Sequence, residues 1–364
     1  MESVGVMAAD RSVLPDPAFW RNKRVLLTGH TGFKGSWAAL WLTKLGAKVT
    51  GFALPPDTDP SLFDLAKVGD EITSIIGDLR DRSMVESVVA RAQPQIVLHL
   101  AAQPIVRRAI AEPVDTISTN VLGTAMVLDA LRAVEGLEAV LVVTSDKVYA
   151  NDDQGLAFGE QDALGGKDPY SASKAAAELI TRAFAKSYFE KNGVKVATAR
   201  GGNVIGGGDY AMDRIVPDIV RAATRGEKLV LRMPQATRPW QHVLDCLCGY
   251  FVYAQQLVEG HDTLPRALNF GPKAAQHLTV GTIAETMLRS LTGEARWEHV
   301  PLDGNIEMTT LAVDSSKARQ MLGWSDRLTG DRLLEWTTSW YRGIGQDADA
   351  RDITLQQIDR YTDL

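Results

Sequence analysis

The sequence predicts an α/β protein with a doubly wound parallel sheet and a smaller C-terminal α/β lobe. Short apolar runs without polar alternation recur up to about residue 200, separated by longer stretches with helical periodicity. Strands that are apolar throughout are buried on both faces, and strand–helix alternation is typical of a parallel sheet covered by helices. A glycine-rich turn directly after the first apolar run supports the same fold class.

Each predicted element follows from a local pattern. The apolar run Arg24–Thr28 indicates the first buried strand, and the helix expected over Lys34–Leu45 is terminated by Gly46. The same alternation places strands at 48–52, 72–76, 96–100, 139–144 and 195–199, and helices at 81–92, 113–134 and 170–192. After Arg200 the regularity weakens, and scattered helices such as 244–258 and 280–291 are expected.

Composition excludes several classes of protein. The 364 residues carry a net charge of −6, which argues against nucleic acid as a partner, because phosphate backbones bind excess Lys and Arg. No apolar run approaches the roughly 18 residues that would suggest a membrane span. Cys246 and Cys248 stand two positions apart on a predicted helix and complete neither a disulfide nor a metal site. We therefore expect a cytoplasmic protein without a metal.

Three segments at the ends of predicted strands indicate a bound dinucleotide. Gly29, Gly32 and Gly35 follow the first strand, where they permit a tight turn, close approach to a pyrophosphate and close helix packing. Asp78 follows the third strand, where it could accept from an adenine amino group, and Leu100-Ala-Ala-Gln103 follows the fourth, beside the nicotinamide half. Each segment alone also fits a structural turn. Together they favour a dinucleotide, because ligands of parallel sheets bind at these strand ends.

The dinucleotide site sets the expected domains. We expect an N-terminal, loosely ordered extension over 1–22 and an NAD-binding Rossmann domain over 23–200. A substrate-binding lobe is expected mainly over 201–345, with some segments returning to the sheet, followed by a tail over 346–364. No acidic residue directly follows the second strand to hold the adenosine ribose; Asp57 or Asp59 could do so from a loop. NAD is favoured over NADP if one of these aspartates holds the ribose hydroxyls.

The candidate catalytic residues lie in two motifs. Tyr170 and Lys174 are spaced i, i+4 at the start of a predicted helix and share one face. A phenol with a pKa of about 10 is a poor base at neutral pH, but a nearby ammonium favours the phenolate. Ser145 follows the fifth strand, where it could bind a substrate hydroxyl or the ketone formed from it. Asp146 and Lys147 come next and either carry a second proton transfer or form a solvated turn.

Six segments together closely resemble the CDP-glucose 4,6-dehydratases of the extended short-chain dehydrogenase/reductase superfamily. The resemblance extends from about Lys23 to Trp340. The segments are Thr28-Gly-His-Thr-Gly-Phe-Lys-Gly-Ser-Trp37, Leu100-Ala-Ala-Gln-Pro104, Thr144-Ser-Asp-Lys-Val-Tyr149, Tyr170-Ser-Ala-Ser-Lys174, Arg200-Gly-Gly-Asn-Val-Ile-Gly-Gly-Gly-Asp209 and Arg238-Pro-Trp-Gln-His-Val243. The Ser-Asp-Lys and Arg-Pro-Trp-Gln-His elements are more specific to this dehydratase than the others.

The resemblance implies an NAD-dependent enzyme that dehydrates CDP-glucose to a 4-keto-6-deoxy sugar nucleotide. Tyr170 would remove the C4 hydroxyl proton as C4 is oxidised, and Asp146 would protonate the leaving C6 hydroxyl before hydride returns to C6. In the wider family a Glu takes the C5 proton at the position of Lys147. Here Lys147 would act either as a base of lowered pKa or as a charged group that stabilises the enolate, and both roles stay open.

The resemblance also implies the binding residues, a homodimer or higher oligomer, and a place in deoxysugar synthesis such as that of lipopolysaccharide O-antigen. The coenzyme contacts would be Gly29, Thr31, Gly32, Phe33, Lys34, Gly35, Asp78, Leu79, Leu100, Ala101, Ala102, Gln103, Tyr170 and Lys174. The substrate contacts would be Gln103, Arg107, Arg200, Asn203 and Arg238. For the last three, an internal salt bridge or loop hydrogen bond is an equal alternative.

Two rival functions fit parts of the sequence. The first is another nucleotide-sugar enzyme of the same fold, either a dehydratase for a different nucleotide or a 4-epimerase, and the epimerase would need Ser145, Tyr170 and Lys174 but not Asp146 and Lys147. A non-catalytic, dinucleotide-sensing regulator would need none of these residues, and the presence of Tyr170 and Lys174 argues against it.

Overall fold

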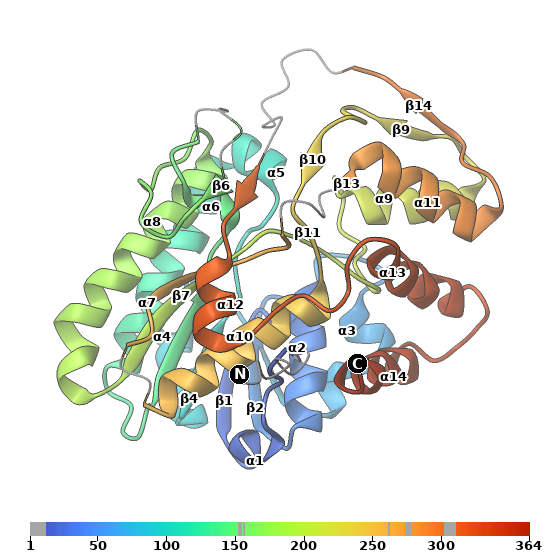
Figure 1. Cartoon of the computed structure of the whole chain (residues 1–364). Helices are drawn as coiled ribbons and strands as arrows, with labels where there is room; N and C mark the ends of the chain where they lie inside the picture. Colours follow the sequence, from blue (N-terminus) through green and yellow to red (C-terminus); the bar gives the residue numbers. More distant parts are fainter. Residues whose placement is uncertain (1–11, 152–154, 156, 261–262, 274–277, 302–310) are drawn as a thin grey trace, which may run out of the picture.

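A seven-stranded, fully parallel sheet forms the centre of the molecule (Figure 1). The computed structural model describes residues 12–151, 155, 157–260, 263–273, 278–301 and 311–364. The strand order is β12-β7-β5-β4-β1-β2-β3. The strands are β1 (Arg24–Thr28), β2 (Lys48–Ala53), β3 (Thr73–Ile76), β4 (Ile96–His99), β5 (Ala139–Val143), β7 (Lys195–Gly201) and β12 (Ala267–Phe270). The predicted fold class is confirmed.

Helices cover both faces of this sheet (Figure 1). The side chains of β1 alternate between two cores: Val25 and Leu27 pack with α2 and α10, and Leu26 packs with α4 and α7. This alternation follows from the two-residue period of a strand and explains why both sets are apolar. The helices are α2 (Phe33–Lys44), α10 (Val243–Val258), α4 (Arg82–Ala92), α7 (Gly123–Leu131) and α8 (Pro169–Phe184).

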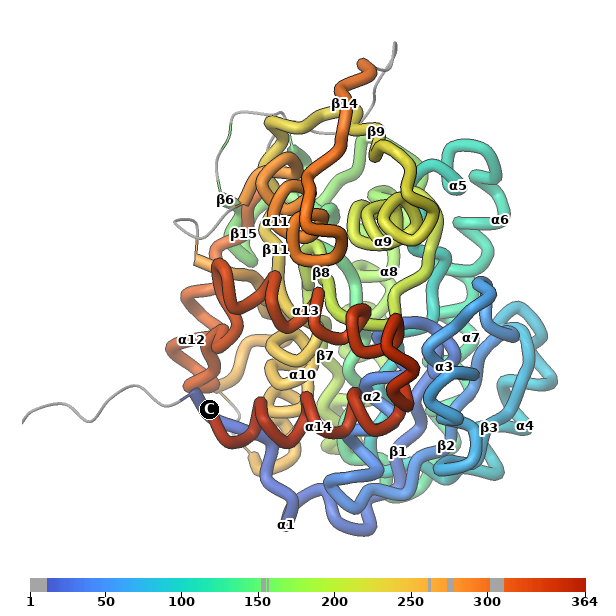
Figure 2. Tube along the Cα trace, turned by 90° about the vertical axis from the view of Figure 1, so that its right-hand side faces the viewer, coloured from blue at the N-terminus to red at the C-terminus, as the bar shows by residue number. Residues whose placement is uncertain are grey.

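A smaller lobe stands beyond the carboxyl ends of the strands, where α9 packs on α11 and four strands form short pairs (Figure 2). Its elements are α9 (Ile215–Arg225), β9 (Leu229–Leu231), β10 (Thr237–Arg238), β13 (Leu278–Thr279), α11 (Val280–Thr292) and β14 (Trp297–His299). Two further parallel pairs are β8 (Asn203–Ile205) with β11 (Trp240–His242) and β6 (Ala157–Phe158) with β15 (Ala312–Val313). Further helical segments are α3 (Leu62–Leu65), η1 (Val68–Asp70), η3 (Asp146–Val148), α12 (Ser316–Leu322) and α13 (Asp331–Ile344).

The two longest predicted helices are interrupted. The stretch expected as one helix over 113–134 begins with a short helix at Pro113, after the separate α5, and continues through a π-helical turn. Within that turn the Asn120 side chain points inward, accepting from Gln103 N and donating to Ser173 Oγ. Such insertions are frequent where a side chain is needed at a site. The segments are α5 (Val106–Ala111), α6 (Pro113–Ile117), η2 (Ser118–Leu122), η4 (Ala185–Phe189) and η5 (Glu190–Asn192).

Both chain ends depart from expectation. The prediction of a loosely ordered extension is wrong for residues 12–22: α1 (Pro17–Trp20) is capped by Asp16, and Trp20 is fully buried against Phe251. An Asp cap followed by proline is a helix-start signal. Residues 1–11 lie outside the described chain. At the other end, α14 (Ala350–Thr362) packs across α2 with Tyr361 buried (Figure 2).

In the part of the chain that the structure describes, we find no helix with the length and apolar character needed to cross a bilayer.

Candidate active site

A cavity of about 360 Å³ lies between the carboxyl ends of the strands and the lobe. Its walls combine the turn after β5, the start of α8, the glycine-rich segment after β7 and the lobe segment around β9. The sequence-predicted residues that line it are Phe33, Lys34, Arg107, Ser145, Lys147, Tyr170, Asn203 and Arg238. Segments far apart in the sequence thus meet in one site.

The start of α8 places the predicted catalytic pair. Asp168 caps the helix by accepting from Ser171 N at 3.0 Å, and Pro169 occupies its first turn. Tyr170 is therefore in the first turn and Lys174 one turn further on the same face. Both side chains are buried, and Lys174 Nζ donates to the Val143 carbonyl at the end of β5, 3.2 Å away.

Burial dominates the ionisation of this pair. It raises the pKa of Tyr170 to about 12, against the lowering effect of a hydrogen bond to Ser145. Burial also lowers the pKa of Lys174 to about 7, and the nearby Lys34 lowers it further while Glu178 opposes the shift. We expected Lys174 to lower the pKa of the Tyr170 phenol. In the protein without coenzyme, burial outweighs any such effect, and the phenol is protonated at neutral pH.

Ser145, Asp146 and Lys147 form a compact hydrogen-bonded turn. Ser145 Oγ accepts from Lys147 N at 3.2 Å and donates to Asp146 Oδ1 at 3.0 Å. Lys147 Nζ donates to Asp146 Oδ1 at 3.0 Å and to Asn203 Oδ1 at 3.1 Å. Asp146 is fully buried, just behind the cavity wall, so these residues do not form a solvated turn.

One oxygen of Asp146 stands apart. Within the described residues, Asp146 Oδ2 has no hydrogen-bond partner although it is buried. It lies next to the cavity-lining Gly202, where an added Cβ would be 3.3 Å from this oxygen. A buried carboxylate oxygen without a partner is costly for folding and is typical of a functional site.

The glycine-rich turn after β1 fits the pyrophosphate of a dinucleotide. An added Cβ at Gly35 would lie 1.9 Å from the Gly29 carbonyl oxygen, and Gly29 has φ +81°. Gly32 is exposed and precedes α2 without any side-chain cap, so the first N–H groups of the helix stay available for phosphate. Thr31 reinforces the turn by donating to the Leu54 carbonyl at 2.8 Å.

The strand ends beside this turn carry the other predicted coenzyme contacts. Leu79 is buried after β3, and the strand end at β4 exposes part of Leu100, Ala101 and Ala102. Ala101 N donates to Thr28 Oγ1 at 3.2 Å, which ties the β4 end to the β1 end.

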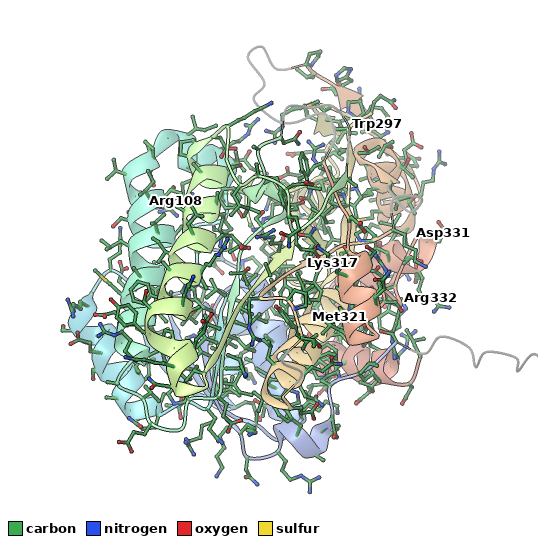
Figure 3. The ribbon with its side chains drawn as sticks, turned by 60° about the vertical axis from the view of Figure 1, so that its left-hand side comes forward. Arg108, Trp297, Lys317, Met321, Asp331 and Arg332 are labelled. Carbon is green, nitrogen blue, oxygen red and sulfur yellow. The ribbon has the colours of Figure 1, made fainter. Side chains whose placement is uncertain are left out.

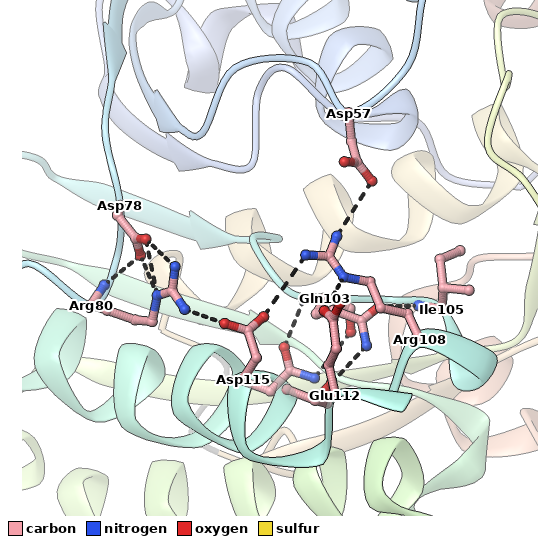
Figure 4. Close-up of polar contacts among 10 residues, drawn as sticks. Asp57, Asp78, Arg80, Gln103, Ile105, Arg108, Glu112 and Asp115 are labelled. Carbon is pink, nitrogen blue, oxygen red and sulfur yellow. Dashed lines mark hydrogen bonds and ion pairs between the residues drawn. The ribbon is translucent and has the colours of Figure 1, made fainter. Parts of the chain in front are cut away.

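A network of ion pairs surrounds the expected adenine end (Figure 4). Arg80 binds both carboxylate oxygens of Asp78 and reaches on to Asp115, and this hydrogen bonding holds the pKa of Asp78 below its usual value. In the same network, Asp57 Oδ2, on the loop after β2, lies 3.7 Å from Arg108 Nη1 on α5. Arg80 and Arg108 were not singled out from the sequence. The adenine contact of Asp78 and the ribose contact of Asp57 or Asp59 stay predictions.

Two predicted substrate residues are placed elsewhere. Arg200 is buried and donates to Glu178 and to Tyr149, and it is not part of the cavity wall. Gln103 also lies outside the wall, because its side chain donates to Thr116 at 2.8 Å and accepts from Ile105 N at 2.6 Å. The internal salt bridge, the alternative weighed for Arg200, is the observed arrangement. Their positions do not support direct substrate contacts.

Arg214 is a cavity residue that the sequence reasoning missed. It pairs with Asp209 at 3.0 Å and lines the cavity close enough to Tyr170 to oppose the rise of its pKa. Asp209 closes the glycine-rich motif Gly201–Asp209, so a cation five residues later was the available signal. The cavity therefore holds Arg107, Arg214, Arg232 and Arg238.

Comparisons with known proteins show the family of this chain. The family model described as GDP-mannose 4,6 dehydratase matches residues 26–337. A CDP-glucose 4,6-dehydratase of Salmonella typhimurium is 44% identical over 340 residues, covering 90% of this chain and 94% of the relative. The chain belongs to the 4,6-dehydratase family.

Solved structures give the same result for the fold. MoeE5, in complex with UDP-glucose and NAD, has a TM-score of 0.72 at 26% identity and covers 87% of this chain and 98% of its own. The dTDP-glucose 4,6-dehydratase of Bacillus anthracis, in complex with NAD, has a TM-score of 0.73 at 23% identity, covering 89% and 98%. These 4,6-dehydratase and nucleotide-sugar folds confirm the Rossmann-type architecture.

Proposed function

We propose that this 4,6-dehydratase uses NAD to convert CDP-glucose into CDP-4-dehydro-6-deoxyglucose. The observation that carries the proposal is the arrangement of Ser145, Lys147 and Tyr170 on one cavity wall with Asp146 directly behind it. Oxidation alone needs only the serine, tyrosine and lysine of this family. A buried acid and an amine beside them supply what an elimination needs in addition. The 44% identity to a CDP-glucose 4,6-dehydratase supports the cytidine nucleotide.

The residues present fit NAD. The glycine turn with the uncapped α2 N-terminus would hold the pyrophosphate, Asp78 and Leu79 would contact the adenine, and Lys174 would bind the nicotinamide ribose. NAD⁺ when bound supplies a hydride acceptor for C4, a hydride donor for C6 and a positive ring beside the phenol.

The chain's own groups then divide the proton transfers between them. Tyr170, hydrogen-bonded to Ser145, takes the C4 hydroxyl proton, and Ser145 holds the oxygen of the resulting ketone. The ketone acidifies C5. As a neutral amine, Lys147 would take the C5 proton while a protonated Asp146 gives its own proton to the departing C6 oxygen. As an ammonium, Lys147 would stabilise the enolate oxygen, and the Asp146 carboxylate would take the C5 proton through its unpartnered Oδ2 and pass it to the departing C6 oxygen. The group that takes the C5 proton or its neighbour returns a proton to C5 when C6 is reduced.

The nucleotide diphosphate is expected among the cavity arginines. Arg107 and Arg238 approach from different walls, and Asn203 is held by Lys147 beside them. Guanidinium groups suit this task because they bind phosphate oxygens in pairs.

We further propose a homodimer in the cytoplasm, within deoxysugar synthesis such as that of O-antigen. Four apolar side chains are exposed on α6, η2 and α8, which pack on one another: Val114, Ile117, Leu122 and Leu179. Val114 is 79% exposed, and several exposed apolar side chains grouped on packed helices indicate an interface, whereas single ones do not. Cys246 and Cys248 are both free and buried, which fits a reducing compartment.

The deciding experiment is incubation of the purified chain and NAD⁺ with CDP-, dTDP-, UDP- and GDP-glucose. We expect a 4-keto product, detected by its absorbance in alkali, mainly from CDP-glucose. A product formed chiefly from another nucleotide would correct the base. An epimerised hexose without 4-keto product would overturn the dehydratase assignment.

A further inference from the structure

Glu178 occupies the centre of a buried polar cluster directly behind the catalytic residues. It lies on α8 one helical turn after Lys174 and two turns after Tyr170, so all three side chains share one face. Its carboxylate is 4% exposed and accepts three hydrogen bonds: from Thr144 Oγ1 at 2.5 Å, Thr198 Oγ1 at 2.8 Å and Arg200 Nη2 at 2.8 Å. One carboxylate thus joins α8 to the ends of β5 and β7.

The three side chains on this face of α8 contact three consecutive residues at the end of β5, Val143, Thr144 and Ser145. Tyr170 is hydrogen-bonded to Ser145, Lys174 donates to the Val143 carbonyl, and Glu178 accepts from Thr144. Tyr170 and Lys174 are predicted catalytic residues, whereas Glu178 has no predicted role. Thr144 directly precedes Ser145, so a shift of Glu178 would be passed straight to the catalytic serine.

A second arm of the cluster reaches the far end of the same turn. Arg200 Nη1 donates to Tyr149 Oη at 2.9 Å and to the Glu160 carbonyl at 3.2 Å. Tyr149 Oη in turn donates to Asn269 Oδ1 at 2.6 Å, on β12. Glu160 also binds Lys317, 3.1 Å away on the outer helix α12 (Figure 3). Residues 144 and 149 therefore bound the catalytic turn and are both tied to the Glu178–Arg200 pair.

We propose that Glu178 is a positioning residue for the dehydratase reaction, holding the turn Thr144–Tyr149 against the helix that carries Tyr170 and Lys174. The proposal rests on the proposed function and assigns the site a residue beyond its five predicted catalytic groups. A buried ion pair is a poor source of stability, because apolar residues of the same volume often do as well. The Glu178–Arg200 pair is therefore better explained by the geometry and the negative charge that Glu178 gives the site.

The charge reaches Lys174 as well as the turn. The groups that face Lys174 are Tyr170 and Glu178 on α8, Lys34 on α2 and His99 on β4. Lys34 disfavours the ammonium and Glu178 favours it. Burial lowers the pKa of His99 to about 3, so its ring adds no charge near neutral pH. Glu178 is the one anion in this set.

The test compares Glu178→Gln, Glu178→Asp and Glu138→Gln with the wild type in kcat/KM across pH. Glu138 is a matched control at the opposite end of β5, where it accepts from Lys23 at 2.6 Å and from Gln95 at 2.7 Å. We expect Glu178→Gln to lower kcat/KM by about 10²-fold, the size of effect caused by small misplacements. We also expect both limbs of its pH profile to move to lower pH, because losing an anion lowers the pKa of nearby acids.

Glu178→Asp should return the limbs to their wild-type positions, since the charge is kept, while its shorter reach leaves kcat reduced. Glu138→Gln should change neither. The proposal is overturned if Glu178→Gln keeps wild-type kcat/KM, or if its activity falls without any shift of the limbs. Should Glu178→Gln fail to fold, Glu178→Asp is used instead. A reduced kcat with pH limbs at the wild-type positions supports the proposal, and wild-type kcat overturns it.

A failure of the proposed function would look different. Wild-type chain without turnover would refute the dehydratase, and Glu178 would then be tested on the phenolate absorbance of Tyr170. That signal is the wild-type spectrum minus the Tyr170→Phe spectrum across pH, with NAD⁺ present. Glu178→Gln should move it to lower pH, and an unmoved titration would refute the positioning role.

Discussion

Asp146 Oδ1 lies 3.0 Å from Lys147 Nζ, so the two residues proposed for the elimination form an ion pair within one turn. The other carboxylate oxygen, Oδ2, is buried and unpartnered among the described residues. The carboxylate is therefore held by one oxygen and offers the other. Oδ2 is therefore the oxygen that can take up and deliver a proton, while Oδ1 stays paired with Lys147.

Asp146→Asn should stop the reaction after the first oxidation. The amide keeps the shape but has no carboxyl proton to give, so we expect turnover to fall by about 10²–10⁴-fold, the usual contribution of a general acid. Reduced coenzyme should accumulate and be visible by its near-ultraviolet absorbance. Asp162→Asn is the control, because among the described residues its carboxylate makes a surface contact, accepting from Gly159 N at 2.8 Å. Full turnover by Asp146→Asn would remove the elimination role.

Substitution of Lys147 separates its two possible roles. Among the described residues, Lys147 Nζ is paired with the Asp146 carboxylate at 3.0 Å, and this pairing favours the ammonium and the enolate-stabilising role. We therefore expect Lys147→Arg, a permanent cation, to keep about a tenth of the activity, and Lys147→Met to lose at least about 10²-fold. The measurement is 4-keto product formation. Equal loss in both variants would instead identify Lys147 as the C5 base.

Much of the fold could be predicted because its signals are local. The strands β1, β2 and β4 were placed within about one residue, since apolar runs bounded by glycines and polar residues mark buried parallel strands. The interruption at Asn120 could not be predicted. It depends on a contact with Ser173, 53 residues away, which no local periodicity reports.

The site was predictable where a motif encodes it and not where packing does. Tyr170, Lys174 and Ser145 stand in motifs whose spacing fixes their place. Arg200 stands in a motif too, yet its guanidinium turns inward to Glu178, and nothing in the local sequence distinguishes the two directions. The ionisation of Tyr170 likewise depends on burial, which the sequence does not report at one residue.

Lys174→Met should make the folded chain more stable near neutral pH while abolishing activity. With a pKa of about 7 when folded and 10.5 ordinarily, the amine is charged in both states below pH 7, and the destabilisation is then complete. Between these values only the unfolded chain binds the proton, so wild-type stability gains from this group as pH rises. The methionine variant should lack that gain. Denaturant unfolding at several pH values, with the exposed Lys186→Met as control, measures it; equal slopes for all three proteins would contradict it.

Gly35→Ala should disrupt the coenzyme turn. Its new Cβ would lie 1.9 Å from the Gly29 carbonyl oxygen, a backbone atom that cannot move without opening the turn. We expect a loss of about 1–3 kcal/mol in unfolding free energy and a clear loss of NAD⁺ affinity, measured by denaturation and calorimetry. Gly345→Ala is the matched control, because its Cβ would meet nothing closer than 3.5 Å. Normal NAD⁺ affinity in Gly35→Ala would refute the assignment of this turn to the pyrophosphate.

Charges placed on the exposed apolar patch should separate the proposed dimer. Val114 on α6 and Leu179 on α8 are 79% and 57% exposed, and burying such side chains between two copies removes each from water. The double variant Val114→Glu, Leu179→Glu should therefore run as a monomer in sedimentation at concentrations where the wild type is dimeric. Met321→Glu, on the surface of α12 (Figure 3), is the control because it is 40% exposed but far along the chain from the patch. A double variant that sediments like the wild type would place the subunit contact on another face, and dissociation of Met321→Glu would place it on α12.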